Sequence, residues 1–134
     1  MRFSFWLTSI LIFTSFFSFP QKLKNKVSYK LESVFVAKQN NKLAKDKASL
    51  IFNTKEKTAK CNLSCTNIAL NYKLKKSKIL FTAINSNLLP CPDHLLGLES
   101  DLKENFSHIN YYQIKNKKLY FFDRKDTLLI FYEQ

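Results

Sequence analysis

Three cysteines and two histidines are the side chains in this sequence that could most readily support metal, redox or nucleophilic chemistry. Cys61 and Cys65 are separated by three residues, Cys91 follows much later, and neither His94 nor His108 lies at a paired-ligand spacing. A structural zinc ion needs four ligands, and a redox-active pair of this type needs the C-x-x-C spacing. The sequence therefore predicts no metal site and no cofactor.

Acyl hydrolysis needs a nucleophile, a base beside it and donors for an oxyanion. His94 or His108 could act as the base, but no serine lies in a glycine-bearing turn that would expose it as a nucleophile. Glu99 and Asp101 do not form an acid–base pair either, because residues two apart on a helix diverge. We predict that the protein is not an enzyme, with an envelope hydrolase as a minor alternative.

Residues 1–20 differ in composition from the rest of the chain. Arg2 is followed by an apolar run from Phe5 to Phe19 that ends at Pro20, which is typical of a secretory signal peptide and short for a bilayer span. We expect cleavage to leave residues 21–134 as one exported domain, periplasmic or secreted, without a transmembrane segment. An uncleaved amino-terminal anchor is the alternative, because the residues before Pro20 match a cleavage site poorly.

The chain is strongly basic, with 22 Lys and Arg against 10 Asp and Glu. Loss of residues 1–20 removes only Arg2 from this count and leaves a net charge of about +11. Nearly all of that charge is lysine, whereas sites that recognise phosphate more often use the two-pronged guanidinium of arginine. Compositional drift is therefore the favoured explanation of the charge, and a selected polyanion site is the alternative.

Alternating apolar residues predict antiparallel strands along most of the chain. Every second residue from Ile68 to Leu74 is apolar, which predicts a half-buried strand. The next strand, 79–84, is apolar on both faces and is predicted to be buried on both. Further strands are expected at 27–36, with a bulge near Glu32-Ser33, and at 49–53, 58–63, 111–115, 118–122 and 127–133.

One helix is predicted after the last cysteine, with Pro92 at its start and Asp93 as its cap. Its apolar stripe consists of Leu95, Leu98, Leu102 and Phe106. The sequence thus predicts an α+β domain: a mainly antiparallel β sheet or partly open barrel of about six to eight strands, with one α-helix before a C-terminal β-meander.

The order of these elements is similar to that of the META domain family, which includes the heat-shock protein HslJ. Ser64 and Thr66 flank Cys65, and they differ from the family pattern, which has Gly before and Asn after the corresponding cysteine. The corresponding pieces are YKLESV at 29–34, SLIF at 49–52, Ser64-Cys65-Thr66, the hairpin at 67–84, Leu89-Pro90-Cys91, Glu99 in the helix, and KLYFF with TLLIFYE.

The resemblance implies a disulfide between Cys65 and Cys91, because both match family positions. Cys61 is then either a buried thiol, which we favour, or a free thiol open to disulfide exchange. The resemblance also implies a stress-related protein of the cell envelope, which we expect to be monomeric and to bind a protein or an envelope polymer. A secreted basic effector or inhibitor that binds an acidic partner is the alternative.

Interleaved aromatic and basic residues near the C-terminus are the best candidate binding surface. On a nucleic-acid-binding sheet such residues would stack bases and hold phosphates, but export argues against a specific nucleic-acid target. Alternation also places half of the aromatics in the core, and the interleaved run continues to Phe121 and Phe122, so an ordinary closing hairpin with solvated lysines is the favoured interpretation. The candidate residues are Tyr111, Tyr112, Lys115, Lys117, Lys118 and Tyr120.

Overall fold

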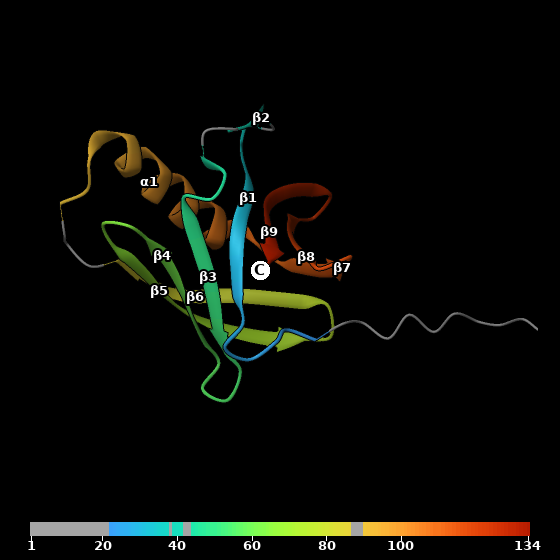
Figure 1. Ribbon diagram of the computed structural model, residues 1–134. Helices are drawn as coiled ribbons and strands as arrows, with labels where there is room; N and C mark the ends of the chain where they lie inside the picture. The colour runs from blue at the N-terminus through green and yellow to red at the C-terminus, as the bar shows by residue number, and fades with distance from the viewer. Residues whose placement is uncertain (1–21, 38, 42–43, 87–89) are drawn as a thin grey trace, which may run out of the picture.

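The computed structural model describes residues 22–37, 39–41, 44–86 and 90–134 (Figure 1). The predicted signal peptide at 1–20 lies outside the described residues. No helix in the described part of the chain has the length and hydropathy needed to cross a bilayer. The elements are β1 (Ser28–Val36), β2 (Gln39–Asn40), β3 (Ala48–Asn53), β4 (Thr58–Leu63), β5 (Asn67–Lys75), β6 (Lys78–Ser86), α1 (Asp93–His108), β7 (Tyr111–Lys115), β8 (Lys118–Asp123) and β9 (Asp126–Glu133).

The strands form one antiparallel sheet that closes on itself through pairing of β1 with β9. Eight strands make the ring, and the two-residue β2 pairs only with the end of β1. The predicted class, an α+β domain with a partly open barrel and one helix before a C-terminal meander, is confirmed. The expected bulge in β1 is also present, as a shift of register against β9 between Leu31 and Ser33.

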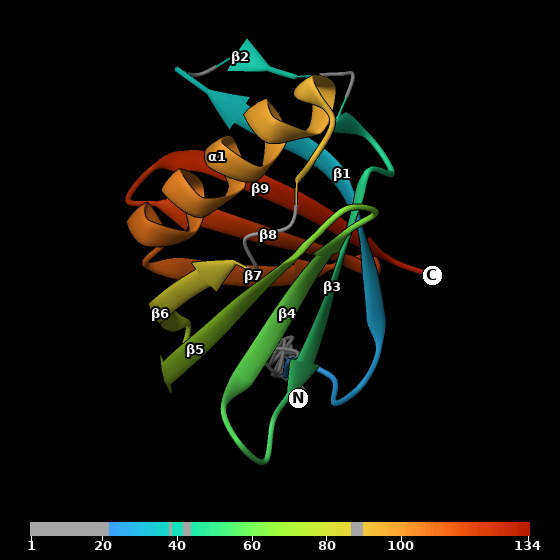
Figure 2. The ribbon, with the colours of Figure 1, turned by 90° about the vertical axis from the view of Figure 1, so that its left-hand side faces the viewer.

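The strand pairing of the ring is shortest between β6 and β7, which pair only at Lys78 and Tyr111. The 24-residue connection through α1 separates them in the sequence, and the helix crosses one opening of the ring near this gap (Figure 2). The inward-facing rings of Phe81, Phe106 and Phe121 span the gap. Phe81 lies 5.0 Å from Phe106 and 5.5 Å from Phe121 between ring centroids, with edge-to-face geometry.

The four apolar residues predicted to face inward on α1 are buried. The prediction for Asp93 is wrong: Pro92 is the N-cap, no side chain caps the helix, and Asp93 is the first helical residue. There its carboxylate still favours the helix through the dipole of the first turn. Sequence reasoning did not single out Asn105, a buried residue whose Nδ2 donates to the carbonyl oxygens of Phe35 (3.2 Å) and Leu128 (3.4 Å). The helix is thereby fixed to both β1 and β9.

The prediction that residues 79–84 are buried on both faces is wrong. Ile79 and Phe81 are buried, but Leu80 on the opposite face is 50% exposed. The helix packs on the inward-facing side of β6, where Phe81 meets Phe106, and leaves the outer side to solvent. An apolar run of this length can therefore belong to a strand with only one buried face.

The short turns of the ring place non-glycine residues at positive φ, including Lys57 (58°), Lys76 (56°) and Lys117 (62°). In the β7–β8 hairpin both central residues, Asn116 and Lys117, have positive φ, as a type I′ turn requires. A side chain in this left-handed region costs about 1 kcal/mol relative to glycine.

Replacement of Lys117 by glycine creates an Asn-Gly turn and should raise the free energy of unfolding by about 0.5 to 1 kcal/mol. Lys115→Gly is the matched control, since it removes the same charge from an exposed position in the strand and should lower stability. Urea unfolding followed by circular dichroism measures both. Equal changes in the two variants would show that the turn conformation is not strained.

Candidate binding surface

The registers of β7, β8 and β9 bring a set of partly exposed apolar side chains together on the outside of the ring. Tyr111 lies opposite Phe122, and Tyr120 opposite Ile130. The rings of Tyr120 and Phe122 are nearly parallel, with centroids 6.3 Å apart. We call this set the aromatic outer face; its members are Tyr111, Tyr120, Phe122, Ile130 and Tyr132.

Lysines border one end of the aromatic outer face. Lys115 pairs with Lys118 across the hairpin, and Lys117 occupies the turn between them. Lys118 forms a 2.8 Å ion pair with Glu32, and this hydrogen bond followed by the charge of Glu32 raises the pKa of Lys118. Lys115 and Lys117 are exposed and make no ion pair within the described part of the chain, so their charges are available to a ligand.

A shallow hollow of about 470 Å³ lies beside these lysines. Its lining combines Lys45, Lys117 and Lys118 with the carboxylates of two glutamates and with Tyr132. The Tyr132 hydroxyl donates to Asp46 Oδ1 at 2.5 Å, and this hydrogen bond is the main cause of the raised pKa of Tyr132. This hydrogen bond keeps Tyr132, at one end of the aromatic outer face, in a fixed position beside the unpaired charge of Lys117.

Five of the six residues predicted for this surface lie on the outer face or in its turn, and Tyr112 does not. Its side chain is on the inner side of β7, opposite Phe121, and packs against the core. Burial raises the pKa of Tyr112. Sequence reasoning missed Ile130 and Tyr132, which reach this face from β9 through the pairing of β8 with β9.

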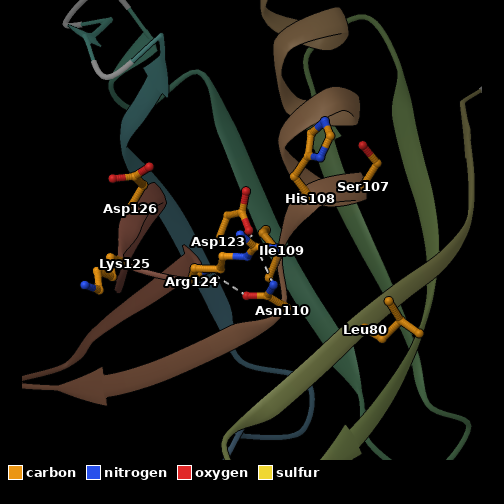
Figure 3. Close-up of a pocket in the computed structure, with 9 residues that line it drawn as sticks. All are labelled: Leu80, Ser107, His108, Ile109, Asn110, Asp123, Arg124, Lys125 and Asp126. Carbon is orange, nitrogen blue, oxygen red and sulfur yellow. Dashed lines mark hydrogen bonds between the residues drawn. The ribbon is translucent and has the colours of Figure 1, made fainter.

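A second hollow, of about 820 Å³, lies between the end of α1, β6 and the β8–β9 turn (Figure 3). Asn110 joins these segments: its Oδ1 accepts from the Arg124 amide at 3.0 Å, and its Nδ2 donates to Asp123 Oδ1 at 3.3 Å. Ser107 and His108 line the same hollow. The Ser107 hydroxyl donates to the Glu104 carbonyl oxygen at 2.5 Å, so its proton is directed to the helix backbone.

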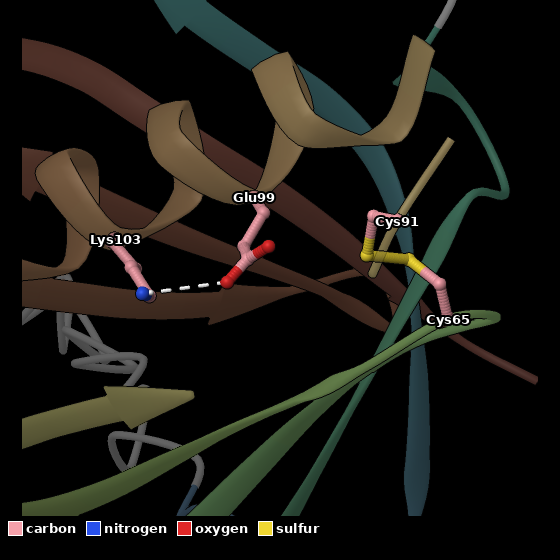
Figure 4. Close-up of a disulfide and its surroundings, with 4 residues drawn as sticks. All are labelled: Cys65, Cys91, Glu99 and Lys103. Carbon is pink, nitrogen blue, oxygen red and sulfur yellow. Dashed lines mark ion pairs between the residues drawn. A yellow bond between two sulfur atoms is a disulfide. The ribbon is translucent and has the colours of Figure 1, made fainter. Parts of the chain in front are cut away.

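Cys65 and Cys91 lie where the β4–β5 turn meets the segment that leads into α1 (Figure 4). Cys65 and Cys91 form the expected disulfide, with Cα atoms 5.2 Å apart. Cys61 is a buried free thiol in the core, as we favoured, and burial raises its pKa to about 12. No group of three or more potential metal ligands occurs among the described residues.

The META domain family model matches residues 21–134. The chain belongs to the META domain family. Two solved structures share its fold: an NMR structure of a protein from Burkholderia xenovorans (15% identity, TM-score 0.65, 82% of this chain and 83% of that one) and a crystal structure of a DUF4847 family protein from Bacteroides vulgatus (12% identity, TM-score 0.52, 64% and 58%). A comparison with curated proteins gives no match.

This META domain departs from the family pattern beside the cysteine, and its backbone explains why the change is tolerated. Ser64 and Thr66 replace Gly and Asn, yet neither they nor Cys65 has positive φ. The turn is closed by the Leu63 amide, which donates to the Thr66 carbonyl oxygen at 2.8 Å. A side chain at these positions therefore causes no backbone strain.

Removal of the disulfide from this META domain with Cys65→Ser and Cys91→Ser should lower the free energy of unfolding by about 3 to 4 kcal/mol, because it frees a loop of 26 positions in the unfolded chain. Denaturant titration measures the loss.

In the native wild type, Cys61 should not react with a thiol reagent until the protein unfolds, since burial disfavours the thiolate. Rapid modification of the folded protein, or peptide mapping that links Cys61 to another cysteine, would contradict this arrangement.

Proposed function

We propose that this META-domain protein is a stress-related, exported protein of the cell envelope that acts without catalysis by binding an anionic envelope polymer. The supporting observation is the register that places Tyr111, Tyr120 and Phe122 on the same outer face as exposed lysines. Membership of the META family supports the link to stress and the envelope.

The aromatic outer face suits an acidic polysaccharide. Flat rings offer apolar faces on which sugar rings can pack, and the neighbouring lysines attract carboxylate or phosphate groups. The stacked pair of Tyr120 and Phe122 and the position of Lys78, whose Nζ lies 6.0 Å from the Tyr111 ring centroid, keep these rings ordered. Affinity then depends on both ring contact and charge, and the charge-dependent part falls with salt.

A non-catalytic role agrees with the geometry of the larger hollow. Acyl transfer needs a serine hydroxyl that hydrogen-bonds to its base, and the Ser107 hydroxyl instead donates to the Glu104 carbonyl oxygen. The alternative of a basic effector with an acidic partner differs in one testable respect: it would depend on net charge over the whole surface and not on the aromatic outer face.

Binding of polygalacturonate, an acidic polysaccharide, should weaken about tenfold in Lys115→Gln/Lys117→Gln at 0.1 M salt and change less than about twofold in Lys55→Gln/Lys60→Gln. The control pair is also exposed, with one lysine in a turn and one in a strand, and β4 lies opposite β8 in the ring. Tyr120→Ala should weaken binding by a similar factor without any change in charge. Titration calorimetry measures each affinity, with neutral dextran as the uncharged polymer.

Equal losses in the two lysine pairs, with no effect of Tyr120→Ala, would replace this proposal with diffuse attraction to any acidic partner. Tight binding that persists in high salt would contradict the charge-dependent part of the proposal.

Export should leave a mature amino terminus between about residues 16 and 22, since the apolar run ends at Pro20. Amino-terminal sequencing of the protein recovered from the envelope fraction tests this expectation. Recovery of a chain that still begins at Met1 would instead support an uncleaved anchor.

A further inference from the structure

A third groove, distinct from the aromatic outer face, runs between α1 and the strand ends of β1 and β9. It has a volume of about 280 Å³ and an apolar side formed by Phe35, Val36 and Leu128. Val36 is 43% exposed, which is unusual for a large aliphatic side chain in this domain. The groove also carries three carboxylates, those of Asp101 and Glu104 on α1 and that of Asp126 at the start of β9.

These three carboxylates make no ion pair with any residue that the structure describes, although the chain has 22 basic and 10 acidic residues. The ion pairs that do form use Glu32, Glu99 and Glu133. Asp101 and Glu104 are three residues apart on α1 and therefore repel each other. Burial and then the charge of Glu104 raise the pKa of Asp101, as expected for a carboxylate that lacks a cation.

Asn105 adds a polar group to the groove. It is buried, and both of its hydrogen bonds to Phe35 and Leu128 use Nδ2, which leaves Oδ1 without a donor among the described residues. A carbonyl oxygen beside unpaired carboxylates accepts the N–H groups of an ammonium or guanidinium well. His108 at the end of α1 and Asp126 at the start of β9, both labelled in Figure 3, line this groove as well as the second hollow.

We propose that this groove binds an extended peptide segment of a partner protein in which basic and apolar residues alternate. A lysine or arginine would lie against the carboxylates of Asp101 and Glu104 and the Asn105 carbonyl oxygen on α1, and its apolar neighbours would cover Val36 and Phe35. Charge complementarity identifies the partner, because the rest of this basic protein offers no comparable acidic surface among its described hollows. A second copy is a poorer occupant, since two chains of about +11 repel each other.

The proposal goes beyond polymer binding: it assigns a different face and a ligand of opposite charge. The test uses fluorescence anisotropy with a labelled peptide of about nine residues that alternates lysine and valine. Peptides that alternate glutamate with valine, or lysine with serine, are the comparisons. The wild-type protein is compared with Asp101→Asn/Glu104→Gln and with the control Asp93→Asn/Glu56→Gln, which removes the same two charges from exposed positions elsewhere.

The lysine–valine peptide should bind best to the wild type, lose about tenfold in affinity in the groove variant and lose less than about twofold in the control. Val36→Ser should also weaken binding of the lysine–valine peptide while leaving polygalacturonate binding unchanged.

Absence of binding, equal loss in both double variants or equal binding of the glutamate–valine peptide would overturn the proposal. So would sedimentation showing that the groove variant abolishes self-association of the wild type, because the occupant would then be a second copy. Markedly tighter binding by Lys38→Gln/Lys42→Gln would also overturn it, by showing that the chain's own lysines compete for the groove.

Discussion

The contact among Phe81, Phe106 and Phe121 packs the inside of the ring next to its shortest strand pairing, that of β6 with β7. β6 and β7 share a single residue pair, flanked by backbone hydrogen bonds from Ile79 to Asn110 and from Tyr112 to Ser77, so less backbone pairing closes the ring there than between its other neighbouring strands. Edge-to-face contacts of this kind are each worth about 0.5 to 1.5 kcal/mol beyond the area they bury. They connect β6, α1 and β8, and the same interior aromatic chain continues through Phe131 on β9. The disulfide at one end of α1 and Asn105 nearer the other keep Phe106 in position.

This packing positions both proposed binding regions. Since Phe121 and Leu119 face inward on β8, Lys118, Tyr120 and Phe122 must face outward. Positioning α1 by Asn105 also sets one wall of the acidic groove against β1 and β9. One packing arrangement therefore determines the aromatic outer face, with its lysines, and an acidic groove beside the helix.

Local patterns predicted most of this structure. Alternation in 67–75 and 118–122 gave the strands, the four-residue apolar stripe gave α1, and resemblance to the family gave the pairing of Cys65 with Cys91. What failed depends on neighbours distant in sequence. The apolar residues of 79–84 could not reveal that α1 covers only one side of their strand. Tyr111 and Tyr112 are adjacent, and the sequence alone does not say which of the two side chains faces the inside of the ring. Asn105 looked like an ordinary polar helix residue because the carbonyls that it serves are 70 and 23 positions away.

The most direct measurement is an NMR titration of the ¹⁵N-labelled protein with polygalacturonate. Binding at the aromatic outer face predicts amide shift changes concentrated in β7, β8 and β9, with saturation at one common affinity. Small shifts spread over lysine-bearing turns on all sides, including the β3–β4 turn opposite β8, would contradict a shaped site and leave only the attraction of a basic surface.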